Sequence, residues 1–155
     1  MSDKKLASLI DIAIDREIQA RDFYKGLADR IEDPTVKDTL TFLAGEEQKH
    51  REFLEGYRSG LYESESLRLT DVVDYKIAEH LEEPDTTKDM NSAEVYLVAA
   101  HRELQSCRFY RALADLHPDS EARTMLLRMA QEEMKHKEKV EFLYSNTAFP
   151  QTAGG

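Results

Sequence analysis

Two short segments of this sequence each place two glutamates ahead of a lysine and a histidine, AGEEQKH at 44–50 and AQEEMKH at 130–136. On a helix, Glu-x-x-His puts a carboxylate and an imidazole on one face, where both can bind the same metal ion. Two such pairs and two further glutamates carry a charge that matches two divalent cations. The predicted metal ligands are Glu17, Glu47, His50, Glu103, Glu133 and His136.

These residues belong to an internal repeat with an offset of 86 positions. The segment REIQARDFYKGLAD at 16–29 aligns with RELQSCRFYRALAD at 102–115, with eight identities in fourteen positions. The two Glu-Glu segments share five of seven residues. Two copies of one helical hairpin predict a pseudo-twofold bundle, in which a central group in one half faces its equivalent from the other.

The elements that position these residues are four segments with helical apolar periodicity. The spacing predicts helices at 3–32, 35–58, 92–116 and 119–145. Tight turns are expected at Asp33-Pro34 and His117-Pro118, because proline is accepted at the first position of a helix and disfavours helix before it. The third helix has two candidate caps: a capping box formed by Asn91 and Glu94, or Ser92.

About 30 residues separate the second and third helices, which is more than an antiparallel turn needs. A crossover that returns along the bundle would use this length and place the third helix parallel to the second. Thr70 is expected to cap a short helix from Asp71 to about Leu81 within it. The predicted architecture is an all-α four-helix bundle over 1–146, followed by a flexible tail at 147–155.

The predicted ligands interrupt the rows of inward-facing apolar residues, the seams, at the middle of each helix. Glu17, Glu47 and His50 lie roughly 20 to 24 Å from the first hairpin turn, and the other three predicted ligands lie at a similar depth from the second. Buried carboxylates facing one another are costly without a cation, which favours metal binding over a metal-free core. A single Glu-x-x-His motif usually lies on a solvent-exposed helix face. Two copies at matched depth instead indicate a buried metal site. Glu46 and Glu132 lie one turn before the histidines and are alternative ligands. Glu47 and Glu133 are favoured because they fall in line with the inward-facing apolar residues of their helices.

Two tyrosines share the faces of the predicted ligands, seven residues after them. Tyr24 and Tyr110 either hydrogen-bond ligand carboxylates or are core aromatics. The remaining histidines and the cysteine are expected to have surface, capping or simple packing roles, with the cysteine half-buried: His80, His101, His117 and Cys107.

Composition limits the function classes. A formal net charge of −10 argues against nucleic acid and anionic membranes as partners. One cysteine cannot form an internal disulfide, so a reducing compartment, the cytoplasm, is expected. No segment is long and apolar enough for a signal peptide or a membrane span.

The glutamate and Glu-x-x-His pattern, joined by a long crossover, resembles the ferritin-like di-iron carboxylate superfamily. The repeated EExxH motifs and the segment DYKIAEHL at 74–81 are similar to its rubrerythrin branch. The resemblance implies two iron ions per chain, with one histidine for each. Manganese or zinc are alternatives, because these oxygen and nitrogen donors suit manganese as well as iron, and zinc would compete by its raw affinity. It also implies a homodimer or small homo-oligomer rather than a cage.

Two features depart from the rubrerythrin pattern. Full rubrerythrins append a rubredoxin domain with a four-cysteine iron site, whereas this chain has one cysteine, so an external electron donor such as a rubredoxin or flavoprotein is expected. Rubrerythrins also have a glutamate one turn after the third-helix ligand, where this chain has Ser106. The ligand set is therefore nearer that of ferroxidase centres.

Three functions follow as hypotheses. The first is an oxidoreductase in which an Fe(II) pair reduces hydrogen peroxide or O₂ and protects against oxidative stress. The second is a ferroxidase that handles or stores iron. The third is an interaction module with a vestigial metal site.

Overall fold

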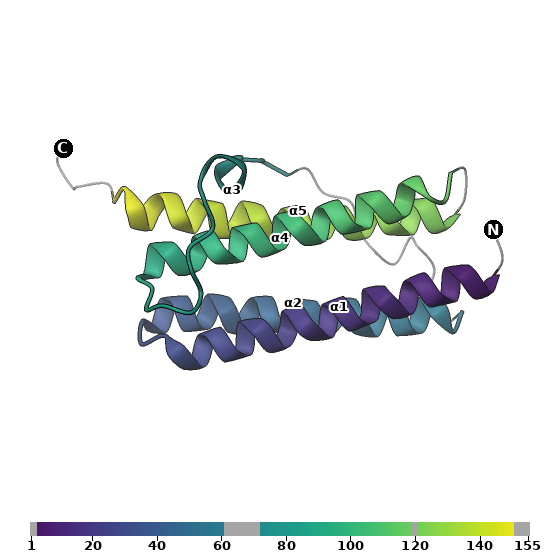
Figure 1. The fold of residues 1–155 in the computed structure, drawn as a ribbon, viewed down its shortest axis with the longest axis horizontal. Coiled ribbons are helices and arrows are strands. Elements are labelled where there is room, and N and C mark those ends of the chain that lie inside the picture. The colour runs from purple at the N-terminus through teal and green to yellow at the C-terminus, as the bar shows by residue number, and fades with distance from the viewer. Residues whose placement is uncertain (1–2, 61–71, 119–120, 151–155) are drawn as a thin grey trace.

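Four long helices and one short helix make up the regular structure of the computed structural model, which describes residues 3–60, 72–118 and 121–150 (Figure 1). The helices are α1 (Asp3–Arg30), α2 (Pro34–Arg58), α3 (Ile77–His80), α4 (Ser92–Asp115) and α5 (Glu121–Ala148). This confirms the predicted all-α bundle. None of these helices combines the length and the apolarity that crossing a membrane requires.

The long helices form two antiparallel hairpins, α1 with α2 and α4 with α5, whose turns lie at opposite ends of the bundle (Figure 1). The connection between the hairpins returns along the bundle, so α4 runs parallel to α2, as predicted. This arrangement places the middle of each helix beside the middle of the others. It is the arrangement that the sequence repeat requires.

The helix ends follow from local capping chemistry. Asp33, in an extended conformation, caps α2 by accepting a hydrogen bond from the Thr35 backbone N–H at 3.0 Å. The preceding helix α1 ends at Arg30, two residues before the predicted end. The opposite difference occurs in α5, which continues to Ala148, so residues 147 and 148 belong to the helix rather than to the predicted tail.

The predicted capping box of α4 is confirmed. Asn91 Oδ1 accepts from the Glu94 backbone N–H at 2.8 Å, and Glu94 Oε1 accepts from the Asn91 N–H at 3.1 Å. Ser92, the alternative cap, instead donates its hydroxyl to Asp33 Oδ2 at 2.9 Å. This bond ties the start of α4 to the α1–α2 turn.

The predicted crossover helix over 71–81 is wrong in extent, since α3 covers only Ile77–His80. Residues 72–76 are not helical, because Asp74 Oδ1 accepts from the Lys76 backbone N–H at 3.0 Å and Lys76 has a left-handed backbone. Such local side-chain bonds compete with helix formation. The proposed cap Thr70 and Asp71 lie outside the described residues.

A buried ion network fastens the crossover to α5. The ammonium of Lys137, fully buried, lies 2.7 Å from Asp74, 2.9 Å from Glu79 and 3.0 Å from Glu141. The second oxygen of Glu141 accepts from the Ala78 backbone N–H at 2.7 Å. Long-range ion pairs therefore shape this connection, which explains why its local sequence pattern predicted the wrong helix.

Replacing Lys137 with methionine is expected to lower the free energy of unfolding of the metal-free chain by about 3 kcal/mol, because it leaves the buried Glu141 carboxylate without its cation. Chemical denaturation followed by circular dichroism measures the change. The repeat supplies a matched control in Arg51, which pairs with Glu55 on the surface at 2.9 Å. Arg51→Met should cost at most about 1 kcal/mol. Equal losses in the two variants would contradict this account.

The apolar core consists of two clusters. One contains Leu27, Val36 and Val140, and the other contains Ile10, Leu54 and Met125. Between these apolar ends of the bundle, the inward positions of the long helices carry buried ionisable side chains. The core therefore supports a polar layer at mid-length.

Candidate metal centre

The structure brings all six predicted ligands together in this layer. Glu17 comes from α1, Glu47 and His50 from α2, Glu103 from α4, and Glu133 and His136 from α5. Each of these residues is at most 5% exposed. The apolar seams carry these groups inward because their neighbours three and four residues away pack in the core.

The six side chains form two overlapping clusters whose potential ligand atoms lie within 4.8 Å of one another. One cluster contains Glu17 and His50, the other contains Glu103 and His136, and both contain Glu47 and Glu133. The arrangement repeats the twofold pattern of the sequence. It offers two metal positions, each with its own glutamate and histidine, and two glutamates that both positions could share.

The histidines turn Nδ1 toward the carboxylates. His50 Nδ1 lies 2.9 Å from Glu133 Oε1 and 3.6 Å from Glu17 Oε1. His136 Nδ1 lies 3.4 Å from Glu47 Oε1 and 3.6 Å from Glu103 Oε2. The two imidazole rings stack, with centroids 5.4 Å apart and an interplanar angle of 20°.

Unsatisfied polar atoms concentrate in this layer. Although ion-pair distances join several groups, eight buried oxygen and nitrogen atoms of the six side chains have no hydrogen-bond partner among the described residues. Buried polar atoms are normally paired, and unpaired ones are costly. Divalent cations would satisfy these atoms, so the donor set fits a pair of metal ions.

The two central carboxylates resist ionisation in the metal-free protein. Burial raises the pKa of Glu47 and of Glu133 well above its ordinary value, and the surrounding carboxylates raise it further. Burial also acts on Glu17 and Glu103, but contact with the neighbouring glutamate and histidine outweighs it and lowers their pKa. Protons on Glu47 and Glu133 thus neutralise part of the negative charge that bound cations would neutralise.

Burial opposes a charge on His50, but the negative charges of Glu17 and Glu47, together with side-chain interactions with Glu17 and Glu132, raise its pKa well above the ordinary value. A protonated imidazole cannot bind a metal ion through the protonated nitrogen. Metal binding must therefore displace protons from the centre.

Both tyrosines contact carboxylates of the opposite hairpin. Tyr24 donates to Glu103 Oε1 at 2.9 Å, and Tyr110 donates to Glu17 Oε1 at 2.5 Å. Burial, together with nearby carboxylate charge, raises the pKa of both phenols and keeps them as donors. The structure thus supplies the predicted hydrogen bonds, while also packing both rings in the core.

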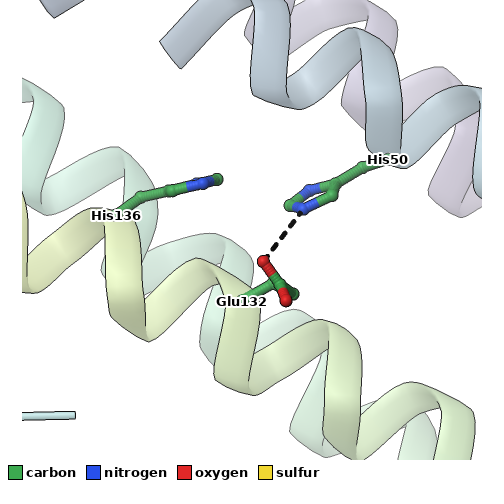
Figure 2. Close-up of side chains that lie close together, drawn as sticks. All are labelled: His50, Glu132 and His136. Atoms are coloured by element: carbon green, nitrogen blue, oxygen red, sulfur yellow. Dashed lines mark ion pairs between the residues drawn. The ribbon is translucent and has the colours of Figure 1, made fainter. Parts of the chain in front are cut away.

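The two alternative ligands are placed differently. Glu46 lies 4.0 Å from Lys49 at the edge of the layer. Glu132 reaches from α5 toward His50 on α2, with Oε2 3.9 Å from Nε2 (Figure 2). Glu132 also forms a smaller cluster with the two histidines. Its interaction with His50 lowers the pKa of Glu132.

The other singled-out residues lie outside the two four-residue clusters. His101 Nε2 lies 2.8 Å from the Leu81 carbonyl oxygen and so contacts the crossover, while His80 is exposed. His117 is buried at its turn. One expectation is wrong, since Cys107 is fully rather than half buried.

Sequence reasoning missed Phe42, whose ring forms a T-shaped pair with that of His136 at a centroid distance of 6.3 Å. The repeat places Arg128 at the equivalent position, so it gave no signal for this contact. The contact arises from tertiary packing between α2 and α5.

Comparison with known proteins identifies one family. The rubrerythrin family model matches residues 8–144. A hypothetical protein from Pyrococcus furiosus has a similar solved structure, with a TM-score of 0.64 and 24% sequence identity, over 95% of this chain and 92% of that one. This likeness concerns the fold alone. A comparison with curated proteins gives no match.

Proposed function

We propose that this chain, which belongs to the rubrerythrin family, is a di-iron oxidoreductase that reduces hydrogen peroxide or O₂. The observation that carries the proposal is the pair of overlapping four-residue clusters with unpaired buried atoms. In this proposal Glu17 and His50 hold one iron ion, Glu103 and His136 hold the other, and Glu47 and Glu133 serve both.

When bound, an Fe(II) pair would supply two electrons, one from each ion, which is the number needed to reduce hydrogen peroxide to water. The protein's own contribution is positional. Tyr24 and Tyr110 hold the carboxylates of Glu103 and Glu17 through hydrogen bonds from their phenols. The apolar clusters on either side of the layer limit access of water to the side chains.

A second candidate function, oxidation and handling or storage of iron, is favoured by Ser106. This position lies one turn after Glu103 and carries no carboxylate, so the six-residue set has only four glutamates. We further propose a homodimer or small homo-oligomer, served by an external electron donor such as a rubredoxin or flavoprotein, with oxidative-stress protection in the cytoplasm as its role.

Oxidation of the Fe(II)-loaded protein separates the candidates. The metal-free chain is loaded anaerobically and mixed with hydrogen peroxide or with O₂, while the near-ultraviolet absorption of Fe(III) is followed. Absorption should grow with either oxidant. His50→Ala and His136→Ala should each slow this growth at least about tenfold, because each removes the nitrogen donor of one position.

His80→Ala, at an exposed position of α3, is the matched control and should leave the rate unchanged. Faster reaction with peroxide supports the oxidoreductase. Preference for O₂ with iron uptake beyond two ions supports iron handling. A fully loaded protein whose absorption does not change with either oxidant would contradict both candidates.

A further inference from the structure

We propose that divalent cations enter and leave the centre between α2 and α5, and that Phe42 and Lys139 form a gate on this route. The proposal rests on the proposed function, because it concerns how the same centre is filled. It goes beyond that function by assigning a role to two side chains that are not metal ligands.

A single aromatic ring separates the centre from solvent on the α2–α5 side. The imidazoles of His50 and His136 extend toward each other between these two helices (Figure 2). The ring of Phe42, on α2, forms a T-shaped pair with that of His136, with centroids 6.3 Å apart. Phe42 is 42% exposed, whereas His136 is 5% exposed. The Phe42 ring therefore contacts solvent as well as a predicted ligand.

The side between α1 and α4 is closed by two layers of rings. The inner layer consists of Tyr24 and Tyr110, which are buried and donate hydrogen bonds to ligand carboxylates. The outer layer consists of Phe23 and Phe109, which are half-buried. The ring centroids of Phe23 and Tyr24 lie 5.8 Å apart, and those of Phe109 and Tyr110 lie 5.3 Å apart. An ion entering on this side would have to pass both layers.

An arginine from the facing helix covers each outer ring. The guanidinium of Arg16 on α1 lies 4.2 Å from the ring centroid of Phe109 on α4, and that of Arg102 on α4 lies 3.9 Å from that of Phe23 on α1. Each stack joins the two hairpins, so opening this side would break contacts between them. The apolar clusters close the two ends of the bundle. The α2–α5 side therefore has the thinnest cover over the centre.

Lys139 adds a positive charge to this cover. It follows His136 by three residues on α5, and its Nζ lies 4.1 Å from the centroid of the Phe42 ring. No carboxylate of the described residues forms an ion pair with Lys139. An ammonium that no carboxylate neutralises repels a divalent cation that approaches it. Lys139 should therefore slow the passage of cations, while the Phe42 ring blocks their path.

The gate can open without unfolding of the bundle. A cation–π contact at an exposed site is weak, and exposed side chains change rotamer rapidly. The Phe42 ring can therefore swing away from His136 while the helices stay in place. Passage of an ion then depends on the fraction of time for which the ring is turned outward.

The rates of Co(II) binding and release test this gate. Stopped-flow mixing of the metal-free full chain with Co(II), followed by the visible absorption of the bound ion, measures entry. Saturating EDTA added to the loaded chain measures exit. Phe42→Ala should speed both processes about tenfold, because the route then stays open. The equilibrium affinity should stay within about twofold, since a gate changes the entry and exit rates by the same factor.

The charge of Lys139 is tested separately from the bulk of Phe42. Lys139→Met should speed Co(II) entry about threefold at low ionic strength. This effect should disappear at about 1 M salt, where the screening length falls to about 3 Å. Lys139→Arg keeps the charge and should behave as the unsubstituted chain. The acceleration in Phe42→Ala should persist at high salt, because it comes from removal of a steric block.

Phe23→Ala and Phe109→Ala are the matched controls, because they remove rings from the α1–α4 side. Both should leave the entry and exit rates unchanged. Phe42→Leu, which keeps part of the bulk, should give rates between those of Phe42→Ala and the unsubstituted chain. Circular dichroism checks that each variant is folded.

The outcomes are distinct. Unchanged rates in Phe42→Ala, or equal acceleration in Phe23→Ala or Phe109→Ala, would overturn the gate while leaving the proposed centre intact. A changed affinity with an unchanged entry rate in Phe42→Ala would also overturn it, because the ring would then act on the bound ion. Failure of the unsubstituted chain to bind Co(II) would instead reject the proposed centre, and the gate with it.

Discussion

Replacing Glu47 or Glu133 with alanine is expected to remove both metal ions, not one. Each of these glutamates belongs to both four-residue clusters, so its loss takes a carboxylate from both metal positions. Glu17 belongs to one cluster only, and Glu17→Ala should retain about one ion per chain. Mass-spectrometric metal analysis after anaerobic Fe(II) loading and dialysis measures these numbers.

Glu46→Ala is the control for charge removal near the site, since Glu46 is adjacent to Glu47 but pairs with Lys49 at the edge of the layer. It should bind as many ions as the unsubstituted chain. If Glu47→Ala and Glu133→Ala both keep the full number of ions, the assignment of shared ligands is wrong. Circular dichroism would show whether a loss of metal reflects the site or the fold.

Glu133→Gln is expected to stabilise the metal-free chain at alkaline pH and to abolish its stabilisation by metal. The pKa of Glu133 is raised in the folded protein, first by burial and then by Glu103 and Glu17. Stability from a group with a raised pKa is full below its unfolded value, near 4.5, and declines as pH rises toward the folded value. Glutamine mimics the protonated form and should remove this decline.

Bound metal is expected to reverse the pH dependence of the free energy of unfolding of the unsubstituted chain. Ligands must lose their protons to bind, so rising pH favours metal binding. At a free metal concentration 1,000 times each Kd, each ion should add about 4 kcal/mol to the free energy of unfolding. Denaturation at pH 6 and pH 8, with and without Mn(II), measures both effects. If the free energy of unfolding of the metal-free unsubstituted chain changed between these two pH values in the same way as that of Glu133→Gln, the account would be contradicted.

The sequence predicted the bundle and the convergence of its six buried ionisable side chains, because the internal repeat and the helix periodicity can both be read from the order of residues. Glu17 and Glu103 fall at equivalent depths in seams that bury apolar neighbours, so their convergence with the Glu-x-x-His pairs follows from packing two like hairpins together. The capping box at Asn91 was predictable for the same reason, since its two bonds join residues three apart. Their roles as metal ligands remain a prediction.

Contacts between distant segments were not predictable in this way. The crossover takes its shape from Lys137, which lies 63 positions after Asp74 and holds it at 2.7 Å. The repeat also implied two equivalent halves, whereas Glu132 contacts His50 and Phe42 packs on His136. These differences depend on contacts between side chains of the two hairpins. The sequence of one hairpin does not indicate which side chains of the other hairpin will contact it.

Electron paramagnetic resonance of the Mn(II)-loaded protein tests the central claim most directly, because it reports whether two ions are neighbours. The spectrum of Mn(II) can be recorded without adding an oxidant, and this ion suits the same oxygen and nitrogen donors. As a second equivalent is added to the metal-free chain, the account predicts that the spectrum of a spin-coupled pair appears and saturates at two ions per chain. Two equivalents bound with only the spectrum of isolated ions, or saturation at one ion, would contradict a centre shared by Glu47 and Glu133.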